Sequence, residues 1–98
     1  MPDPIQVRWT EPAAQDLKKI HLYIQKDSPS AAVTVARALF DEANSLGIMP
    51  GRGRLGKAPG TRELIVTRLP YIIIYRVTPE AIQILRIYHG ARQGPPKL

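Results

Sequence analysis

Residues 9–24 read WTEPAAQDLKKIHLYI and combine a helix start signal with one apolar stripe. Thr10 offers a side-chain oxygen that can cap the first turn, and Glu11 and Pro12 follow at positions where acid and proline are favoured. The apolar residues then recur at spacings of four, three and four positions, which is one face of a helix of about four turns. The stripe consists of Ala13, Leu17, Ile20 and Ile24.

A second helix is predicted after a connection of only a few residues, about 26–28. Ser28 and Pro29 repeat the combination of a capping side chain and a proline in the first turn. Because the connection is so short, the two helices are expected to form an antiparallel hairpin. The second stripe runs through Ala32, Val35, Leu39, Ala43 and Leu46.

Four stretches have the pattern of β-strands. Residues 5–9 alternate apolar and polar side chains, which is typical of a short, half-buried strand. Residues 61–69 are predicted to form a second strand. Pro70 begins the third, whose unbroken apolar run to residue 77 suits a central strand covered on both faces. Residues 81–89 form the last.

The predicted order of elements is therefore β-α-α-β-β-β, in one domain that covers residues 1–98. The simplest packing is an α+β fold in which the helical hairpin covers one face of a mainly antiparallel four-stranded sheet. Residues 90–98 include two adjacent prolines and have no pattern. We expect them to form a flexible tail unless they are bound.

Composition excludes several kinds of chemistry. The chain has no cysteine, so it can form neither disulfides nor thiolate zinc sites, and it has no cysteine nucleophile. With only two histidines, a histidine-rich metal site is hard to assemble, and we predict neither metal nor cofactor. No apolar run approaches the roughly 20 residues of a membrane span, and the N-terminus lacks the basic start of a secretory signal. A cytoplasmic protein with no membrane partner is expected.

Charge is distributed unevenly along this basic chain. The formal net charge is +6, yet residues 1–49 hold five Lys and Arg against six Asp and Glu. Residues 50–98 hold nine Lys and Arg against two Glu, so the second half should carry an anion-binding surface. The partner could be nucleic acid, an acidic protein, or both.

The boundary between the halves is a glycine-rich segment. Residues 47–60 hold five of the seven glycines together with three cations, and we predict a basic loop with no regular element. Within it, residues 51–57 match the phosphate-loop pattern G-x-x-x-x-G-K. We reject that interpretation because a helix precedes the pattern, Ala58 replaces the magnesium-binding hydroxyl, and Pro59 blocks a following helix.

His89 is the candidate acid or base. It ends the last predicted strand, and arginines nearby in the sequence could stabilise a phosphoryl transition state, as RNA cleavage would require. The alternative is a histidine that hydrogen-bonds a neighbouring loop. No second acid or base lies near it in the sequence, so both interpretations remain open.

Several segments together resemble toxins of the RelE/ParE superfamily, which belong to bacterial type II toxin–antitoxin modules. The resemblance spans residues 7 to 95. The matching segments are W-T-x-x-A-x-x-D-L-x-x-I-x-x-Y-I at 9–24, P-x-x-G-R-x-G at 50–56, G-T-R-E-L at 60–64, P-Y-x-x-x-Y-R-V at 70–77 and I-L-R-x-x-H-x-x-R-Q at 84–93.

This resemblance implies the fold derived above and a cytoplasmic toxin neutralised by a cognate antitoxin in a hetero-oligomeric complex. The antitoxin's C-terminal segment is expected to fold over the helical hairpin and the sheet groove. A basic surface with apolar helix faces suits an acidic, amphipathic segment that orders on binding. The residues predicted to bind the antitoxin are Leu17, Ile20, Ile24, Val35 and Leu39.

The molecular target divides the superfamily. RelE-like members cut mRNA on the ribosome, and here Arg62, Arg76, His89 and Arg92 would have to do so. Cutting members carry an arginine where this chain has Ile72. We therefore favour the ParE-like alternative, inhibition of DNA gyrase without nuclease chemistry, over an mRNA interferase or a protein that binds only its antitoxin. The residues predicted to contact the target are Arg52, Arg54, Lys57, Arg62, Arg68 and Arg92.

Overall fold

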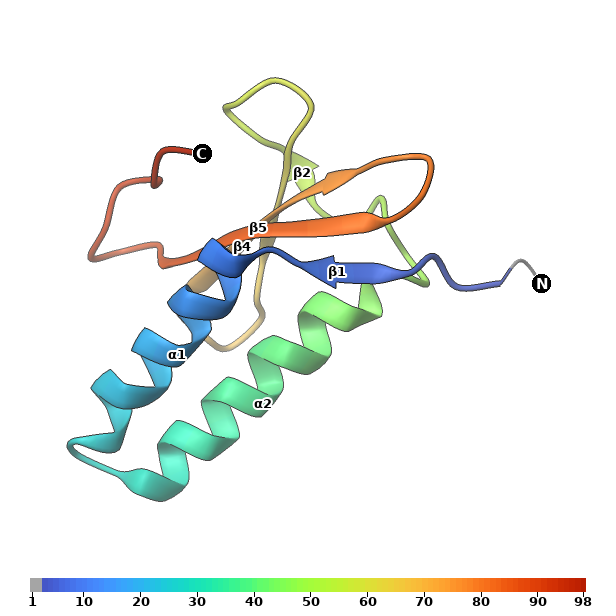
Figure 1. Ribbon diagram of the computed structural model, residues 1–98. Coiled ribbons are helices and arrows are strands. Elements are labelled where there is room, and N and C mark those ends of the chain that lie inside the picture. The colour runs from blue at the N-terminus through green and yellow to red at the C-terminus, as the bar shows by residue number, and fades with distance from the viewer. Residues whose placement is uncertain (1–2) are drawn as a thin grey trace.

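A computed structural model describes residues 3–98 of the chain. Two helices pack beneath a twisted sheet, and the C-terminal tail lies on the opposite side of that sheet (Figure 1). The elements in chain order are β1 (Val7–Trp9), α1 (Glu11–Gln25), α2 (Pro29–Ser45), β2 (Arg54–Leu55), β3 (Arg62–Ile65), β4 (Tyr71–Val77) and β5 (Ile82–His89).

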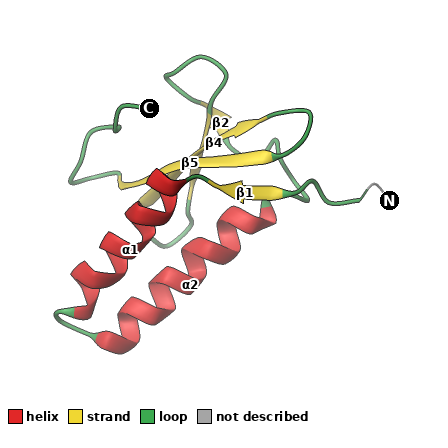
Figure 2. Ribbon diagram, in the orientation of Figure 1, coloured by secondary structure: helices red, strands yellow, loops and turns green. Residues whose placement is uncertain are grey.

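The sheet has five strands in the order β1-β5-β4-β3-β2 (Figure 2). β1 runs parallel to β5, and the other neighbours are antiparallel. The predicted α+β class and mainly antiparallel sheet are confirmed, but the expected count of four strands is wrong. The extra strand is β2, inside the segment predicted to have no element. Two residues are too few to show an alternating pattern, and pairing with β3 creates the strand.

The strand predicted at 61–69 is shorter than expected. β3 ends at Ile65, and a turn leads to β4 with Arg68 in the left-handed region at φ 71°. The Val66 N–H donates to the Tyr71 carbonyl at 3.1 Å and closes that turn. Because residues 66 and 69 are apolar, the strand pattern in the sequence continues past the end of β3. In the structure, backbone hydrogen bonds form a turn there.

Both predicted helix starts are confirmed. The Thr10 hydroxyl accepts the Ala13 N–H, and the Ser28 hydroxyl accepts the Ala31 N–H. A proline follows each cap in the first turn, and Glu11 adds the expected acid in α1. The short connection makes the two helices an antiparallel hairpin (Figure 1).

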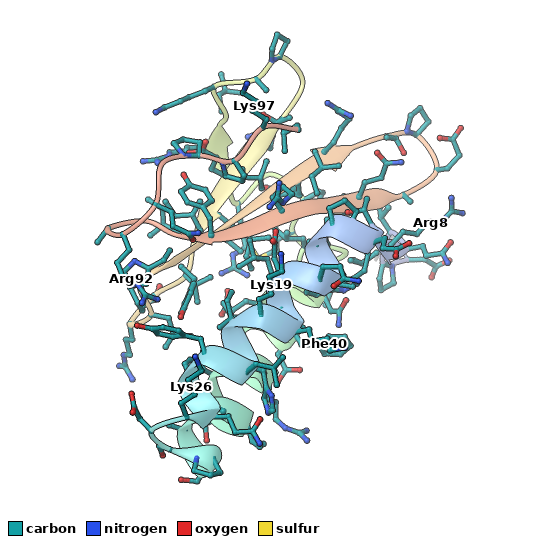
Figure 3. All side chains as sticks on the ribbon, turned by 60° about the vertical axis from the view of Figure 1, so that its left-hand side comes forward. Arg8, Lys19, Lys26, Phe40, Arg92 and Lys97 are labelled. Atoms are coloured by element: carbon teal, nitrogen blue, oxygen red, sulfur yellow. The ribbon has the colours of Figure 1, made fainter. Side chains whose placement is uncertain are left out.

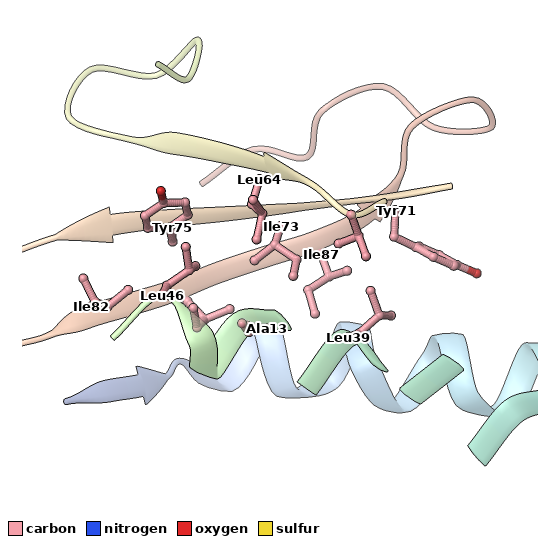
Figure 4. Close-up of a cluster of buried hydrophobic side chains, with 12 residues drawn as sticks. Ala13, Leu39, Leu46, Leu64, Tyr71, Ile73, Tyr75, Ile82 and Ile87 are labelled. Carbon is pink, nitrogen blue, oxygen red and sulfur yellow. The ribbon is translucent and has the colours of Figure 1, made fainter. Parts of the chain in front are cut away.

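The core lies between this hairpin and one face of the sheet (Figure 4). Leu39 of α2 and Tyr75 of β4 have no exposed surface. Leu17, Ile20 and Val35 pack against the same cluster, so these parts of the stripe predicted to bind the antitoxin face the sheet. Ile24, near the end of α1, is half-buried.

We call the other side of the sheet, which no helix covers, the open face. The alternation along β4 places Ile72, Ile74 and Arg76 on it, since Tyr71, Ile73 and Tyr75 belong to the core. Ile74 is nevertheless only 3% exposed. The tail helps to cover it, because residues 95–98 line a cavity together with Ile74.

Candidate functional site

A pocket of about 370 Å³ opens where α1, the end of β5 and the tail meet. Its lining includes Lys19 and Tyr23 from α1, Tyr71 from β4, and His89 and Arg92 from the C-terminal end of the sheet. Figure 3 labels Lys19 and Arg92 at this side of the molecule. We call it the His89 pocket. It combines cations with aromatic rings, which suits an anionic partner with a planar or apolar part.

His89 uses one ring nitrogen to hold the following turn. Its Nδ1 accepts the backbone N–H of Ala91 at 3.2 Å and that of Arg92 at 3.0 Å. The ring also contacts Tyr71 edge-on, with 5.4 Å between centroids. Because Nδ1 is an acceptor, the neutral ring carries its hydrogen on Nε2. The structure thus shows the hydrogen bonds of the loop-binding interpretation, and they occupy Nδ1 alone.

Arg92 and Lys19 are the pocket's free cations. The Arg92 guanidinium lies over the Tyr23 ring, 4.5 Å from its centroid, and this stacking links the tail to α1. Within residues 3–98 neither cation forms an ion pair with a carboxylate. Both therefore remain available to an external anion.

Asp16 also lines the pocket, but its carboxylate is already occupied. Arg86 donates to it twice, from Nε at 2.7 Å and from Nη2 at 3.0 Å, and the Ile87 N–H donates at 3.0 Å. The hydrogen bonds from Arg86 raise the pKa of that guanidinium above its ordinary value.

Sequence reasoning missed this pair. Asp16 lies three positions after Ala13 and four before Ile20, so it occupies the apolar stripe. A carboxylate on a buried helix face needs a cation or a hydrogen-bond donor as its partner. This requirement was the signal in the sequence that could have indicated the pair.

The residues predicted to contact the target divide into two groups. Arg52 is paired with Glu42 at 2.8 Å, and Arg54 with the buried Glu63 at 2.9 Å. Arg62 donates to the Gly53 carbonyl at 2.8 Å and so braces the glycine-rich loop. The side chains left without a carboxylate partner in the described part of the chain are Lys57, Arg62, Arg68 and Arg92.

The four residues of a predicted nuclease site do not come together. In the sheet register His89 lies opposite Tyr71, whereas Arg62 lies opposite Tyr75. These positions are four residues apart on β4, about 13 Å along the strand. Arg76, the residue after Tyr75, projects from the open face. Of the three arginines, only Arg92 therefore shares a pocket with His89.

Comparison with known proteins agrees with this architecture. A family model described as the ParE toxin of the type II toxin–antitoxin system parDE matches residues 7–94. The chain belongs to the ParE toxin family. The resemblance to the RelE/ParE superfamily is therefore confirmed, and so is membership of a type II toxin–antitoxin toxin family.

Two individual relatives are both named as toxins. This ParE-family chain is 46% identical over 87 residues to toxin RelE2 of Caulobacter vibrioides, covering 89% of this chain and 97% of that protein. It is 38% identical over 93 residues to the putative toxin Y4kP of Sinorhizobium fredii, covering 95% and 96%.

Two solved structures share the fold of this ParE-family chain. One is the chromosomal ParDE toxin–antitoxin system from P. aeruginosa, with a TM-score of 0.78 at 32% identity, covering 87% of this chain and 95% of that one. The other is the toxin–antitoxin complex RelBE2 from Mycobacterium tuberculosis, with a TM-score of 0.58 at 26% identity, covering 88% and 98%.

Residues 3–98 lack two kinds of feature. These residues contain no group of three or more His, Asp or Glu side chains placed to hold a metal ion. Neither α1 nor α2 is long and apolar enough to cross a membrane.

Proposed function

We propose that this ParE-family toxin arrests growth in the cytoplasm by binding DNA gyrase, without cutting nucleic acid. The observation that carries the proposal is the separation of the candidate nuclease residues along β4. His89 and Arg62 lie at register positions about 13 Å apart along the strand, so the four candidate nuclease residues are not gathered around one phosphate.

The chemistry within the His89 pocket supports the same conclusion. General acid–base cleavage needs two groups that can exchange protons with the reacting oxygens. Here the Nδ1 of His89 accepts two backbone N–H groups, so only its Nε2 can exchange a proton, and the Asp16 carboxylate is held by Arg86 and Ile87 and is not free to act as its partner. The pocket's remaining cations, Lys19 and Arg92, suit binding of an anionic surface.

A cognate antitoxin is the second proposed partner. The solved relatives are named as the ParDE system and the RelBE2 complex, and both are toxin–antitoxin assemblies. The hairpin exposes large apolar side chains, among them Leu22 at 50%, Val33 at 54% and Phe40 at 47%. An acidic, amphipathic antitoxin segment could bury these side chains and pair with the toxin's cations.

Induction of the free toxin in cells, with DNA and protein synthesis followed separately by pulse labelling, tests the gyrase proposal. We expect DNA synthesis to fail first, gyrase to co-purify with the toxin, and the purified toxin to inhibit supercoiling. The variant His89→Ala should still arrest growth, and His21→Ala on α1 is the matched histidine control.

Because one relative is named RelE2, the activity of an mRNA interferase is the second candidate function. Early failure of protein synthesis, with mRNA cut at ribosomes and both effects lost in His89→Ala, would overturn the gyrase proposal in its favour. Arrest of neither process, with antitoxin binding intact, would leave a protein that binds only its antitoxin.

A further inference from the structure

We propose that the open face of the sheet binds the phosphate backbone of duplex DNA through Arg8, Arg76, Lys57 and Lys97. The inference rests on the proposed function, since gyrase holds duplex DNA, and it assigns this face to that DNA. None of these four cations lines the His89 pocket.

The register of three strands places two arginines in one row. Arg8 of β1 and Arg76 of β4 both lie opposite Gln83 of β5, one on each side. Neighbouring strands are about 4.8 Å apart, so the two Cα atoms lie about 10 Å from each other. Arg8 lies between Val7 and Trp9, which pack on the core, so its side chain projects from the open face.

Two lysines extend this row across the open face. Lys57 of the glycine-rich loop and Lys97 of the tail line one cavity together with Ile74. The Lys97 carbonyl accepts a hydrogen bond from Arg86 at 3.2 Å, which fixes the tail above the strands. Figure 3 labels Arg8 on β1 and places Lys97 on the side of the sheet away from the helices.

The four cations are not neutralised within the described chain. None of them forms an ion pair among residues 3–98. The carboxylate on this face, Glu63, is 5% exposed and accepts two hydrogen bonds from Arg54. Glu80, in the turn after β4, is exposed and likewise pairs with no cation in that range. The face therefore carries an excess of positive charge.

The placement of the aromatic rings favours a duplex over a single strand. Proteins that bind single strands stack the bases on accessible aromatic side chains. Tyr88, on the open face, is only 6% exposed, whereas the exposed rings of Tyr23 and Phe40 belong to the helices. A face that offers cations without an accessible ring suits phosphates whose bases are already paired.

The test is fluorescence anisotropy of the purified toxin with a labelled DNA duplex of about 20 base pairs, titrated with NaCl in the absence of gyrase. The slope of log K against log salt is about −0.9 per phosphate neutralised, so four cations give about −3.6. The double variant Arg8→Gln/Arg76→Gln should make the slope less negative by about 1.8. The matched control Lys18→Gln/Lys26→Gln removes the same charge from the helical side and should leave the slope near the wild-type value.

Three results would overturn the proposal: an equal change of slope in both double variants, tighter binding of a single strand or an RNA duplex of the same length, or no salt-dependent binding. Co-purification of gyrase after nuclease treatment separates this inference from the proposed function. Gyrase retained by a toxin that fails to bind DNA would refute only the DNA contact. DNA binding without gyrase capture would refute only the gyrase target.

Discussion

Asp16 on α1 and Arg86 on β5 form a two-pronged ion pair, with Nε–Oδ2 at 2.7 Å and Nη2–Oδ1 at 3.0 Å. β1 pairs with β5 only as far as Ile84, so the rest of that edge lacks a neighbouring strand. The Asp16 carboxylate accepts the Ile87 N–H in its place. One side chain thus protects an open sheet edge and fixes the position of Arg86, which in turn holds the tail.

Removing this carboxylate should destabilise the fold. Asp16→Ala leaves the Arg86 guanidinium and the Ile87 N–H without their partner, and we expect a loss of about 2–4 kcal/mol in the free energy of unfolding. Asp16→Asn should cost less, because its amide oxygen can still accept the Ile87 N–H. Urea denaturation measures both variants. A loss no larger than that of Asp41→Ala, an exposed position on α2, would contradict the assigned role.

The glycine-rich loop should tolerate substitution at one glycine and not at another. A Cβ at Gly53 would lie 2.7 Å from the Tyr75 hydroxyl oxygen and 2.9 Å from the Glu63 carbonyl oxygen. It would disturb the 2.8 Å hydrogen bond from the Gly53 N–H to that hydroxyl. We expect Gly53→Ala to cost about 2 kcal/mol.

Gly51→Ala is the matched control for this loop. A Cβ at Gly51 meets no atom within 4 Å, so its effect should stay within about 0.5 kcal/mol. Thermal melts of the two variants decide the point. Similar melting temperatures would show that Tyr75 does not anchor the loop.

Substitutions at two apolar positions on α2 should distinguish a core residue from a residue of the outer surface. Leu39 has no exposed surface, so Leu39→Ala should cost about 2–5 kcal/mol of unfolding free energy. Val33 is 54% exposed, and Val33→Ala should change stability by no more than about 0.5 kcal/mol. Guanidinium denaturation compares them. A mild effect at Leu39 would mean that its stripe faces outward, as an antitoxin-binding surface would.

Stability should fall in alkaline solution because of Tyr88. Burial, and then the negative charge of Glu63, raise the pKa of this phenol above its ordinary value of 10.0, while Arg54 opposes the shift. The unfolded chain therefore releases the proton first, and the free energy of unfolding decreases as the pH rises above about 10.

Tyr88→Phe should reduce this alkaline slope, whereas Tyr23→Phe, at an exposed position on α1, should not. Denaturation midpoints measured between about pH 9 and 11 provide the comparison. Equal slopes in both variants would show that the Tyr88 phenol does not cause the decrease.

The candidate site could be predicted only in part. His89 and Arg92 were identified from the sequence, and they share a pocket because a turn joins them. Lys19 and Tyr23, which complete that pocket, come from α1 and gave no signal of their own. Their proximity depends on how α1 lies against β5, and no local pattern encodes that contact.

The sequence by itself determined the two helices, their caps, the short connection between them and the apolar β4. These features depend on residues within a few positions of each other, through side-chain periodicity and capping hydrogen bonds. Tertiary structure alone decided that residues 54 and 55 form a strand, that Asp16 holds Arg86, and that Arg62 and His89 lie apart. Each of these features depends on strand register or on contacts between residues distant in the chain. Tertiary packing determines such contacts, and the local sequence pattern does not specify them.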